Sequence, residues 1–341
     1  MIKIVLDCFG GDKGAAATVG GAAIALRQYG DLALILAGAE NKIRAEMERA
    51  GIADSDRVTV LDAPDVIGCD EKPTDAIRLR RDSSMMRAVK LLREDDTVAG
   101  LVSTGSTGAL VAATVLRIGR LRGVWRPAFC PILPTMTGGI VGITDSGANA
   151  ECKPEALLQY AVMGSRYLTS VYGIAEPRVA LLNVGTEAEK GDTLHQEAYK
   201  LLAAEKTIRF VGNMESRDLL SGKYDLVVAD GFSGNVLVKA TEGTALELLK
   251  KIKNDIYSSA KYKFGALFMR KMFAEEKAFM NYQNYGGSVM LGAAKTVVKG
   301  HGSADATSVA VCIGQAYKME QSRLAEQIET ALAALPDAKN D

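Results

Sequence analysis

Short apolar runs alternate with longer stretches of helical periodicity along most of the chain. The runs have the length of buried strands, and the stretches between them repeat apolar residues at helical spacing. This alternation is typical of an α/β protein whose mostly parallel sheet is covered by helices on both faces. The expected strands are 2–6, 32–37, 58–61, 100–103, 128–133, 140–144, 179–183, 208–211 and 226–229, and the expected helices are 15–29, 41–50, 84–93, 109–118, 154–172, 193–204 and one that starts near 234.

No fixed-period repeat interrupts this pattern, and 341 residues are enough for one large domain or two moderate ones. We therefore expect residues 1–341 to form a single α/β domain of three layers, or two interleaved subdomains. Two segments depart from simple alternation. Residues 63–81 contain two prolines and no period and predict a long loop, whereas 128–133 and 140–144 predict an antiparallel pair.

Residues 244–285 have a different character, because apolar side chains at helical spacing are mixed with basic ones. They predict two amphipathic helices that protrude as a hairpin, with its tip near Phe264 and Phe268. Its apolar face either packs against the core or a second subunit, or meets a membrane surface, where the basic flank would contact anionic headgroups. The apolar positions at helical spacing are Leu246, Leu249, Ile252 and Ile256.

Composition narrows the function classes. Basic and acidic side chains number 41 each, so the formal charge is zero, which argues against a nucleic-acid-binding protein. The five cysteines are scattered and never form a Cys-x-x-Cys pair, as expected for reduced thiols in a cytoplasmic protein. The start of the chain lacks the pattern of an export signal, and the longest uncharged stretch, 128–144, is too short to span a membrane.

Several common catalytic motifs are absent from the sequence. They include the Gly-x-x-x-x-Gly-Lys-Ser/Thr loop, the zinc motif His-Glu-x-x-His and the Gly-x-Ser-x-Gly nucleophile elbow. The sequence has only two histidines, His195 and His301, so few residues could serve as the base of a Ser–His–Asp triad. Cys8 lies in a glycine-containing loop where a nucleophile could sit, but a buried inert thiol is the simpler interpretation.

Seven glycine-flanked polar loops follow the apolar runs. The carboxyl ends of parallel strands share one edge of a sheet, so we expect these loops to converge on one crevice. Seven such loops are more than turn chemistry requires. They are 7–12, 103–108, 145–149, 183–191, 212–213, 230–235 and 300–303.

The loop 103–108, Ser-Thr-Gly-Ser-Thr-Gly, leads at once into an alanine-rich helical stretch. Gly105 and Gly108 would let the backbone approach a ligand, and the N–H groups and dipole at the start of the helix would favour an anion. An ordinary βα turn with a Ser or Thr cap has the same sequence. This loop alone does not decide between the two.

The expected crevice would contain backbone N–H groups, hydroxyls, the amides of Asn149 and Asn235, His301 and the cation of Lys190. Such donors suit a phosphate and an oxyanion and demand no metal or cofactor. Two of these residues have simpler interpretations. Lys190 could be a solvated lysine in a charged run, and Asn235 could be a helix N-cap.

In this order, the loops resemble those of the PlsX-type phosphate acyltransferases of bacterial phospholipid synthesis, and the resemblance runs from residue 2 to about 316. Each motif is weak by itself, but the ordered series is highly specific. The motifs are 103–109, 145–149, 182–185 with 190–191, 212–218, 230–235 and 300–302.

The resemblance implies a catalytic domain with the isocitrate and isopropylmalate dehydrogenase type of fold, which phosphotransacetylases share, and a homodimer. It also implies transfer of a long fatty acyl group from acyl carrier protein to inorganic phosphate, giving acyl phosphate. Lys190 and Asn235 match catalytic positions of the family, where phosphate attacks the thioester directly. The residues expected to bind substrate are Asp7, Gly10, Gly11, Asp12, Ser103, Thr104, Gly105, Ser106, Thr107, Gly108, Asp145, Asn149, Asn183, Gly185, Asn213, Asp230, Gly231 and His301.

The resemblance also gives the hairpin a purpose. Acyl phosphate is a reactive lipid, so residues of about 256–273 would touch the inner face of the cell membrane, and an acyl groove would lie beside these helices. An acidic carrier protein needs a basic landing surface, for which the hairpin supplies Lys261, Lys263, Arg270 and Lys271.

This chain departs from the family pattern at a few positions. Cys8 and Phe9 stand where the family has Ala and Met, Ser106 stands in place of Asn, and Thr186 in place of Glu. The change at Cys8 agrees with an inert thiol, because the family residue there has no thiol. The other changes affect the exact phosphate contacts and not the implied reaction. A phosphotransacetylase that uses acyl-CoA, and a catalytically silent scaffold for lipid enzymes, are the alternative functions.

Overall fold

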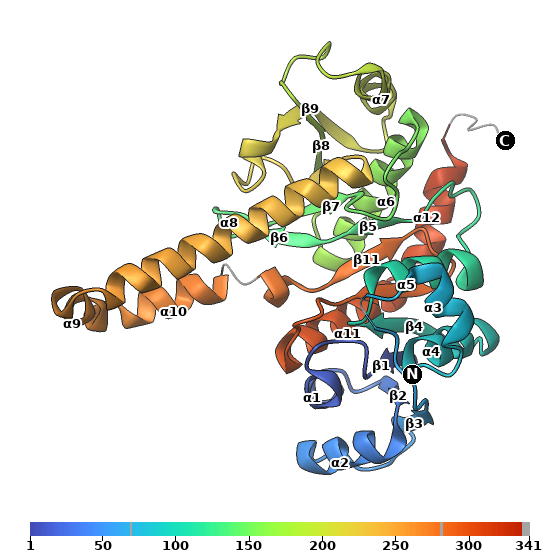
Figure 1. The fold of residues 1–341 in the computed structure, drawn as a ribbon. Coiled ribbons are helices and arrows are strands. Elements are labelled where there is room, and N and C mark those ends of the chain that lie inside the picture. Colours follow the sequence, from blue (N-terminus) through green and yellow to red (C-terminus); the bar gives the residue numbers. More distant parts are fainter. Residues whose placement is uncertain (69, 280–281, 336–341) are drawn as a thin grey trace.

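The computed structural model describes residues 1–68, 70–279 and 282–335, and within them the strands form two sheets (Figure 1). The larger sheet is parallel except for one strand, β11, which is antiparallel to both of its neighbours. The order across it is β3 (Val58–Asp62), β2 (Leu32–Gly38), β1 (Ile2–Asp7), β4 (Val98–Ser103), β12 (Thr296–Lys299), β11 (Ser288–Leu291) and β5 (Ala128–Cys130).

The smaller sheet is parallel except for an edge strand, β6, which pairs with β7 in antiparallel register. The mostly parallel α/β architecture predicted from the alternating pattern is therefore confirmed. The predicted antiparallel pair is confirmed for residues 132–134 with 140–142, whereas 128–130 pair with β11 in the larger sheet. The order across the smaller sheet is β6 (Ile132–Pro134), β7 (Ile140–Thr144), β10 (Leu226–Val228), β8 (Arg178–Asn183) and β9 (Arg209–Glu215).

The predicted strand 128–133 is broken at Pro131. Proline has no N–H and cannot donate to a ladder on that side. The residues before it join the larger sheet as β5, and those after it join the smaller sheet as β6. A single residue thus carries the chain from one sheet to the other.

Alternate residues of each strand face different helices. In β1, Ile4 and Leu6 belong to the apolar cluster that contains α1 (Gly14–Gln28) and α11 (Ala306–Gln321), whereas Val5 belongs to the cluster under α4 (Ser84–Glu94). This is the two-residue period of a strand buried on both faces. The other helices of the two layers are α2 (Glu40–Ala50), α6 (Pro154–Tyr172), α7 (Thr193–Ala204) and α12 (Leu324–Ala333).

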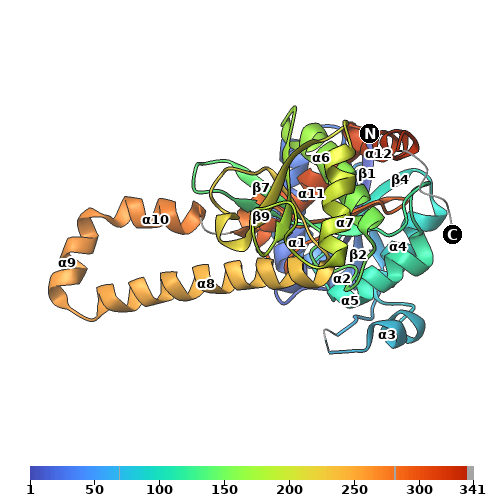
Figure 2. The same cartoon turned by 90° about the horizontal axis from the view of Figure 1, so that it is seen from above.

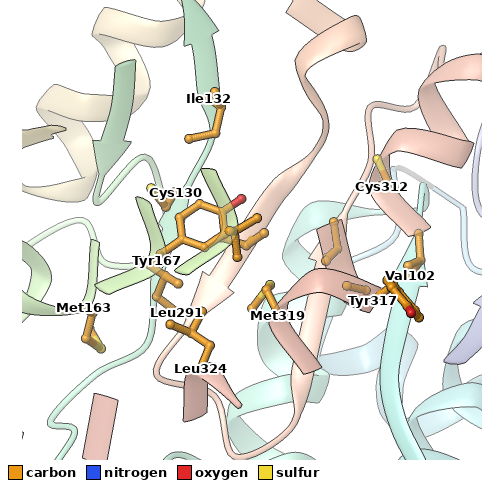
Figure 3. Close-up of a cluster of buried hydrophobic side chains, with 14 of the residues drawn as sticks. Val102, Cys130, Ile132, Met163, Tyr167, Leu291, Cys312, Tyr317, Met319 and Leu324 are labelled. Atoms are coloured by element: carbon orange, nitrogen blue, oxygen red, sulfur yellow. The ribbon is translucent and has the colours of Figure 1, made fainter. Parts of the chain in front are cut away.

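One continuous apolar cluster includes residues from both sheets, with α6 and α11 packed against each other within it (Figure 3). Tyr167 of α6 is fully buried there, and its hydroxyl accepts a hydrogen bond of 3.0 Å from Nε2 of Gln315. Oε1 of Gln315 in turn accepts from the N–H of Gly287, at 2.7 Å. These bonds satisfy a polar side chain that would otherwise be costly to bury.

Two local predictions were wrong, and a third is refined. The segment 63–81 contains a short helix, α3 (Pro73–Leu79), whose first turn accommodates Pro73 because that position needs no N–H. The loop predicted at 212–213 lies inside β9, where Gly212 has a positive φ of 98° and the pairing with β8 shifts register. The helix 109–118 consists of α5 (Thr107–Ala113) followed by a π-helical turn, Thr114–Ile118.

A helical hairpin projects from the body of the molecule, as the sequence predicted (Figures 1 and 2). Its first arm is α8 (Gly231–Tyr257), about 40 Å long at 1.5 Å per residue. The short helix α9 (Ala260–Phe268) forms the tip, and α10 (Arg270–Phe279) returns. Among the described residues, no helix combines the length and apolar character needed to cross a membrane.

The contact between α1 and α11 depends on a small residue. A Cβ at Gly21 would lie 2.6 Å from Cβ of Val309 and 2.8 Å from the carbonyl oxygen of Ala306. We expect Gly21→Ala to lower the free energy of unfolding by about 1–3 kcal/mol, measured by urea titration, because the helices must separate.

The matched control is Gly243→Ala, inside α8, where an added Cβ meets nothing within 4 Å. There the higher helix propensity of alanine should raise the free energy of unfolding by up to about 1 kcal/mol. Equal effects of the two substitutions would contradict the close α1–α11 contact.

Candidate active site

A buried carboxylate ties together the ends of two strands in the larger sheet. Asp7, the last residue of β1, accepts hydrogen bonds from the hydroxyls of Ser84 and Ser103, each at 2.6 Å. The Ser103 hydroxyl oxygen also accepts from the N–H of Gly105, at 3.1 Å. Asp7 therefore positions the loop that follows β4 and is itself fully buried beneath it.

The loops after β1, β4 and β12 lie in direct contact because glycines separate them. A Cβ at Gly10 would be 2.5 Å from Cα of Gly105, and a Cβ at Gly11 would be 2.5 Å from Oγ1 of Thr104. The N–H of Asp12 donates to the carbonyl of Gly302, at 2.8 Å. These three predicted loops are thus one cluster, which we call the β1/β4/β12 cluster (residues 7–12, 103–108 and 299–303).

The start of α5 has the features of a capped helix. The hydroxyl of Ser106 accepts from the N–H of Ala109 at 3.5 Å, so the capping interpretation of this loop is correct for Ser106. Thr107 is exposed beside it, while Gly108 packs near Pro73 of α3. The loop therefore presents Thr107, rather than Ser106, to solvent.

The loop after β7 is organised by Asp145. Its carboxylate accepts from the N–H groups of Phe129, Gly147, Ala148 and Asn149, at 2.7–3.2 Å, and from the Asn149 side chain, at 3.0 Å. Burial raises the pKa of Asp145, and these hydrogen bonds act in the opposite direction. Asp145 and Asn149 hold this loop in place.

The start of α8 packs directly on the same loop. Asp230 is the N-cap and accepts from the N–H of Ser233 at 2.9 Å, so the N-cap interpretation of Asn235 is wrong. Instead, Nδ2 of Asn235 donates to the carbonyl of Ser146, at 3.0 Å. A Cβ at Gly231 would be 2.3 Å from the Asn149 carbonyl oxygen, so this contact requires glycine.

A cleft of about 220 Å³ separates the β1/β4/β12 cluster from this second group of loops. It brings Asn235 and His301, predicted from distant parts of the sequence, to the same cavity. Its polar and glycine lining on the side of the larger sheet is Thr107, Gly286, Gly287, Ser288, Lys299, Gly300, His301 and Gly302, and its polar lining on the side of the smaller sheet is Ser146, Asn235, Lys239 and Glu242.

The cleft contains two lysines, Lys239 and Lys299, and one acidic side chain, Glu242. Nζ of Lys299 donates to the carbonyls of Thr104 and Gly300, which holds a buried cation at the end of β12. Nδ1 of His301 lies 2.8 Å from the hydroxyl of Ser303. Desolvation and the nearby charge of Lys299 lower the pKa of His301, and Asp12 opposes them, so the imidazole is neutral at pH 7.

Lys190 lies on an exposed loop after β8, outside the lining of this cleft. Nδ2 of Asn183 donates to the Lys190 carbonyl at 3.1 Å, and Nδ2 of Asn213 donates to the carbonyl of Glu187 at 2.7 Å. The stem of Lys190 packs over Gly185. Because β8 neighbours β10 in parallel register, the Lys190 loop shares a sheet edge with the start of α8.

Sequence reasoning missed Lys239 and Lys299, which line the cleft, and Ser84, which donates a hydrogen bond to Asp7, whereas Ser146 lies in the predicted loop 145–149. Lys299 directly precedes the predicted loop 300–303, but the apolar run before it was not among the expected strands. Lys239 lies four residues after Asn235 on α8, so it shares a helix face with Asn235. Ser84 lies at the start of a predicted helix, where the sequence has no motif that indicates a binding or catalytic role.

Cys8 is fully buried, and burial together with the charge of Asp7 raises the pKa of its thiol. Its Sγ donates to the carbonyl of Leu6, at 3.5 Å. The interpretation as an inert thiol agrees with this environment. Cys69 lies outside the described residues, and among the rest no group of three or more His, Cys, Asp or Glu side chains is placed to hold a metal.

Comparisons with known proteins identify the family of the chain. A family model described as "Fatty acid synthesis protein" matches residues 2–327. The phosphate acyltransferase of Streptococcus uberis is 41% identical over 334 residues, which cover 98% of each chain. The chain belongs to the phosphate acyltransferase family. It is an acyltransferase, and the resemblance stated from its loops is confirmed.

Two further comparisons extend this result. The phosphate acyltransferase of Halalkalibacterium halodurans is 41% identical over 332 residues, 97% of each chain. A phosphotransacetylase from Streptococcus pyogenes has a similar fold, with a TM-score of 0.60 at 18% identity over 94% of each chain. The likeness to the solved structure concerns the fold.

The lowered pKa of His301 predicts a measurable titration. We expect the Cε1 proton of His301 to titrate in NMR spectra with a midpoint below the usual value of about 6.5. The chain has two histidines, so His301→Gln identifies the resonance. A midpoint at or above 6.5 would contradict the environment described.

The same shift has a consequence for stability. Between the two pKa values, the unfolded chain binds more protons than the folded one, so the contribution of His301 destabilises the fold as the pH falls below about 6.5. Replacement by Gln should therefore flatten the pH dependence of the free energy of unfolding in that window.

Proposed function

We propose that this acyltransferase moves a long fatty acyl group from the thioester of acyl carrier protein to inorganic phosphate, giving acyl phosphate for phospholipid synthesis. The observation that carries the proposal is the position of Asn235, whose amide faces a cleft that also contains Lys299, Lys239 and His301. An anionic nucleophile and a developing oxyanion are the species that such a set of donors and cations stabilises.

In the proposed reaction, an oxygen of hydrogen phosphate attacks the thioester carbonyl carbon, the C–S bond breaks, and the phosphate proton ends on the released thiol. No covalent enzyme intermediate is formed. Nδ2 of Asn235 carries two hydrogens, and one is used by the carbonyl of Ser146. The other has no partner among the described residues and is assigned to the oxyanion.

Lys190 is proposed to bind phosphate and offset its charge during the attack. Its loop shares a sheet edge with Asn235, and a lysine side chain is long and flexible enough to reach toward a bound anion. The β1/β4/β12 cluster, with Thr107 and His301 at its surface, is proposed to hold the phosphate or the thioester carbonyl. Asp7 and Asp145 act on substrate through the loops that they position.

The hairpin is proposed to bring the enzyme to the cytoplasmic face of the membrane. At its tip, Phe264, Leu267 and Phe268 are 65%, 66% and 80% exposed, and the two phenylalanine rings contact edge to face. Exposed aromatic side chains of this kind insert at the lipid interface. The surrounding basic side chains, Lys261, Lys263, Arg270 and Lys271, are exposed and would serve anionic lipids or the acidic carrier protein.

A homodimer is part of the same proposal.

The second candidate function is a phosphotransacetylase that uses acyl-CoA, which the fold of the Streptococcus pyogenes enzyme favours. Acyl phosphate formation from acyl carrier protein and CoA thioesters of equal chain length separates the two. A much higher kcat/KM with the carrier protein supports the first, and the reverse supports the second.

Removing either proposed catalytic group should abolish most of the activity. We expect Asn235→Ala and Lys190→Ala each to lower kcat for phosphate-dependent acyl transfer by about 100- to 1000-fold, the usual cost of one oxyanion donor. Thermal unfolding should stay close to that of the wild type for Lys190→Ala, because that side chain is exposed.

Lys206→Ala, another exposed lysine of the smaller-sheet region, is the matched control and should leave kcat unchanged. Near-normal turnover in the Asn235 variant would rule out the proposed mechanism. An acyl-enzyme trapped during turnover would do the same, since direct attack forms none.

The exposed hairpin tip gives a separate test of the membrane proposal. We expect the double substitution Leu267→Glu/Phe268→Glu to abolish flotation with anionic phospholipid vesicles, because two charges replace the apolar contact. Transfer in free solution should be unaffected. Flotation equal to that of the wild type would assign the tip to another contact.

A further inference from the structure

A second and larger groove adjoins the cleft. It has a volume of about 810 Å³, within the range of about 300–1,000 Å³ typical of ligand sites, and shares Thr107 with the cleft. Trp125 and Arg126 also line it. It is lined by Thr107, Gly108, Val111, Ala112, Val115, Leu116, Gly119, Arg120, Trp125, Arg126, Pro127, Gly147, Ala148 and Asn149.

One wall of this groove is a continuous apolar stripe. Val111, Ala112, Val115 and Leu116 recur at the spacing of one helix face, from α5 through the π-helical turn Thr114–Ile118. Val115 and Leu116 are adjacent in the π-helical turn, and their side chains are 50% and 64% exposed. Adjacent exposed apolar side chains in a concave site favour an apolar occupant.

The stripe does not lie where we expected the acyl groove from the sequence, which was beside the helices of the hairpin. Beside the base of the hairpin, the pocket formed by Leu133, Leu220, Ala245, Phe279 and their neighbours measures only about 30 Å³. A cavity of that size holds about one water molecule. A fatty acyl chain does not fit there without rearrangement, whereas the groove along α5 accommodates one.

We infer that the groove along α5 and the π-helical turn binds the fatty acyl chain of the substrate, with the thioester at Thr107 where groove and cleft meet. This inference rests on the proposed function and adds the location of the chain. The amide-containing arm of a carrier fits the stripe less well. The polar side chains of the groove, which are Thr107, Arg120, Trp125, Arg126 and Asn149, lie outside the stripe, so amides placed along it would be left unpaired.

Trp125 makes the inference directly measurable, since it is the only tryptophan of the chain and lines the groove. A stearic acid brominated in mid-chain quenches tryptophan on contact. We expect saturable quenching of the full-length protein by this probe and none by unbrominated stearic acid. Absence of saturable quenching would overturn the inference, and this result does not depend on catalysis.

The second test blocks the groove and varies the chain. With acyl carrier protein thioesters of 8 to 16 carbons, each buried methylene should raise kcat/KM by up to about fourfold in the wild type. Ala112→Phe should flatten this dependence and lower kcat/KM for the longest chain at least tenfold, with the shortest chain within threefold of wild type. Leu116→Ser, at an exposed position that tolerates change, should act in the same direction.

Ala245→Phe, beside the small pocket at the hairpin base, is the matched control and should keep the wild-type chain-length dependence. A flattened dependence in this control alone would place the chain beside the hairpin and overturn the inference. An equal loss at every length in Ala112→Phe and Leu116→Ser would assign the groove to the carrier arm instead. If the wild type forms no acyl phosphate, the proposed function fails, and the quenching result still decides the groove.

Discussion

The site depends on buried carboxylates that sit at strand ends and accept hydrogen bonds from the loops around them. Asp7 does this for the larger sheet and Asp145 for the smaller one. A hydrogen bond to a charged group contributes about 1.5–3 kcal/mol, and several of them offset the cost of burying the carboxylate. Each carboxylate thereby fixes a loop whose own backbone has no regular structure, and the loops then define the cleft.

Much of the fold follows from the period of the apolar positions. Ile4, Val5 and Leu6 form an uninterrupted apolar run, which predicts a strand buried on both faces. The structure confirms this, because Ile4 and Leu6 pack in one apolar cluster and Val5 in another. The errors occur where tertiary context overrides local pattern. Pro131 lies in an apolar run that predicts a single strand. Only the structure shows that the chain passes there from the larger sheet to the smaller one.

The chemistry of the site was harder to predict than its location. The sequence identified the loops, since glycines and polar residues follow strands, and Asn235 and His301 do meet in the cleft. It did not show that Asp7 and Asp145 face inward, because strand ends reveal which residues are near an edge and not where a side chain points. Lys299 was missed because a single lysine beside an apolar run is typical of a solvent-exposed position.

The order of strands in the larger sheet has a consequence for how the enzyme is made. β12, from the last sixth of the chain, lies between β4 and β11, and through β11 it connects β4 to β5. During synthesis, β4 must therefore present an open edge until residues 296–299 emerge. Pairing of such distant segments is slow and leaves hydrophobic edges accessible. Lys299 and His301 also arrive with this strand, so a chain that stops before residue 296 lacks both the strand that closes the sheet and two side chains that line the cleft.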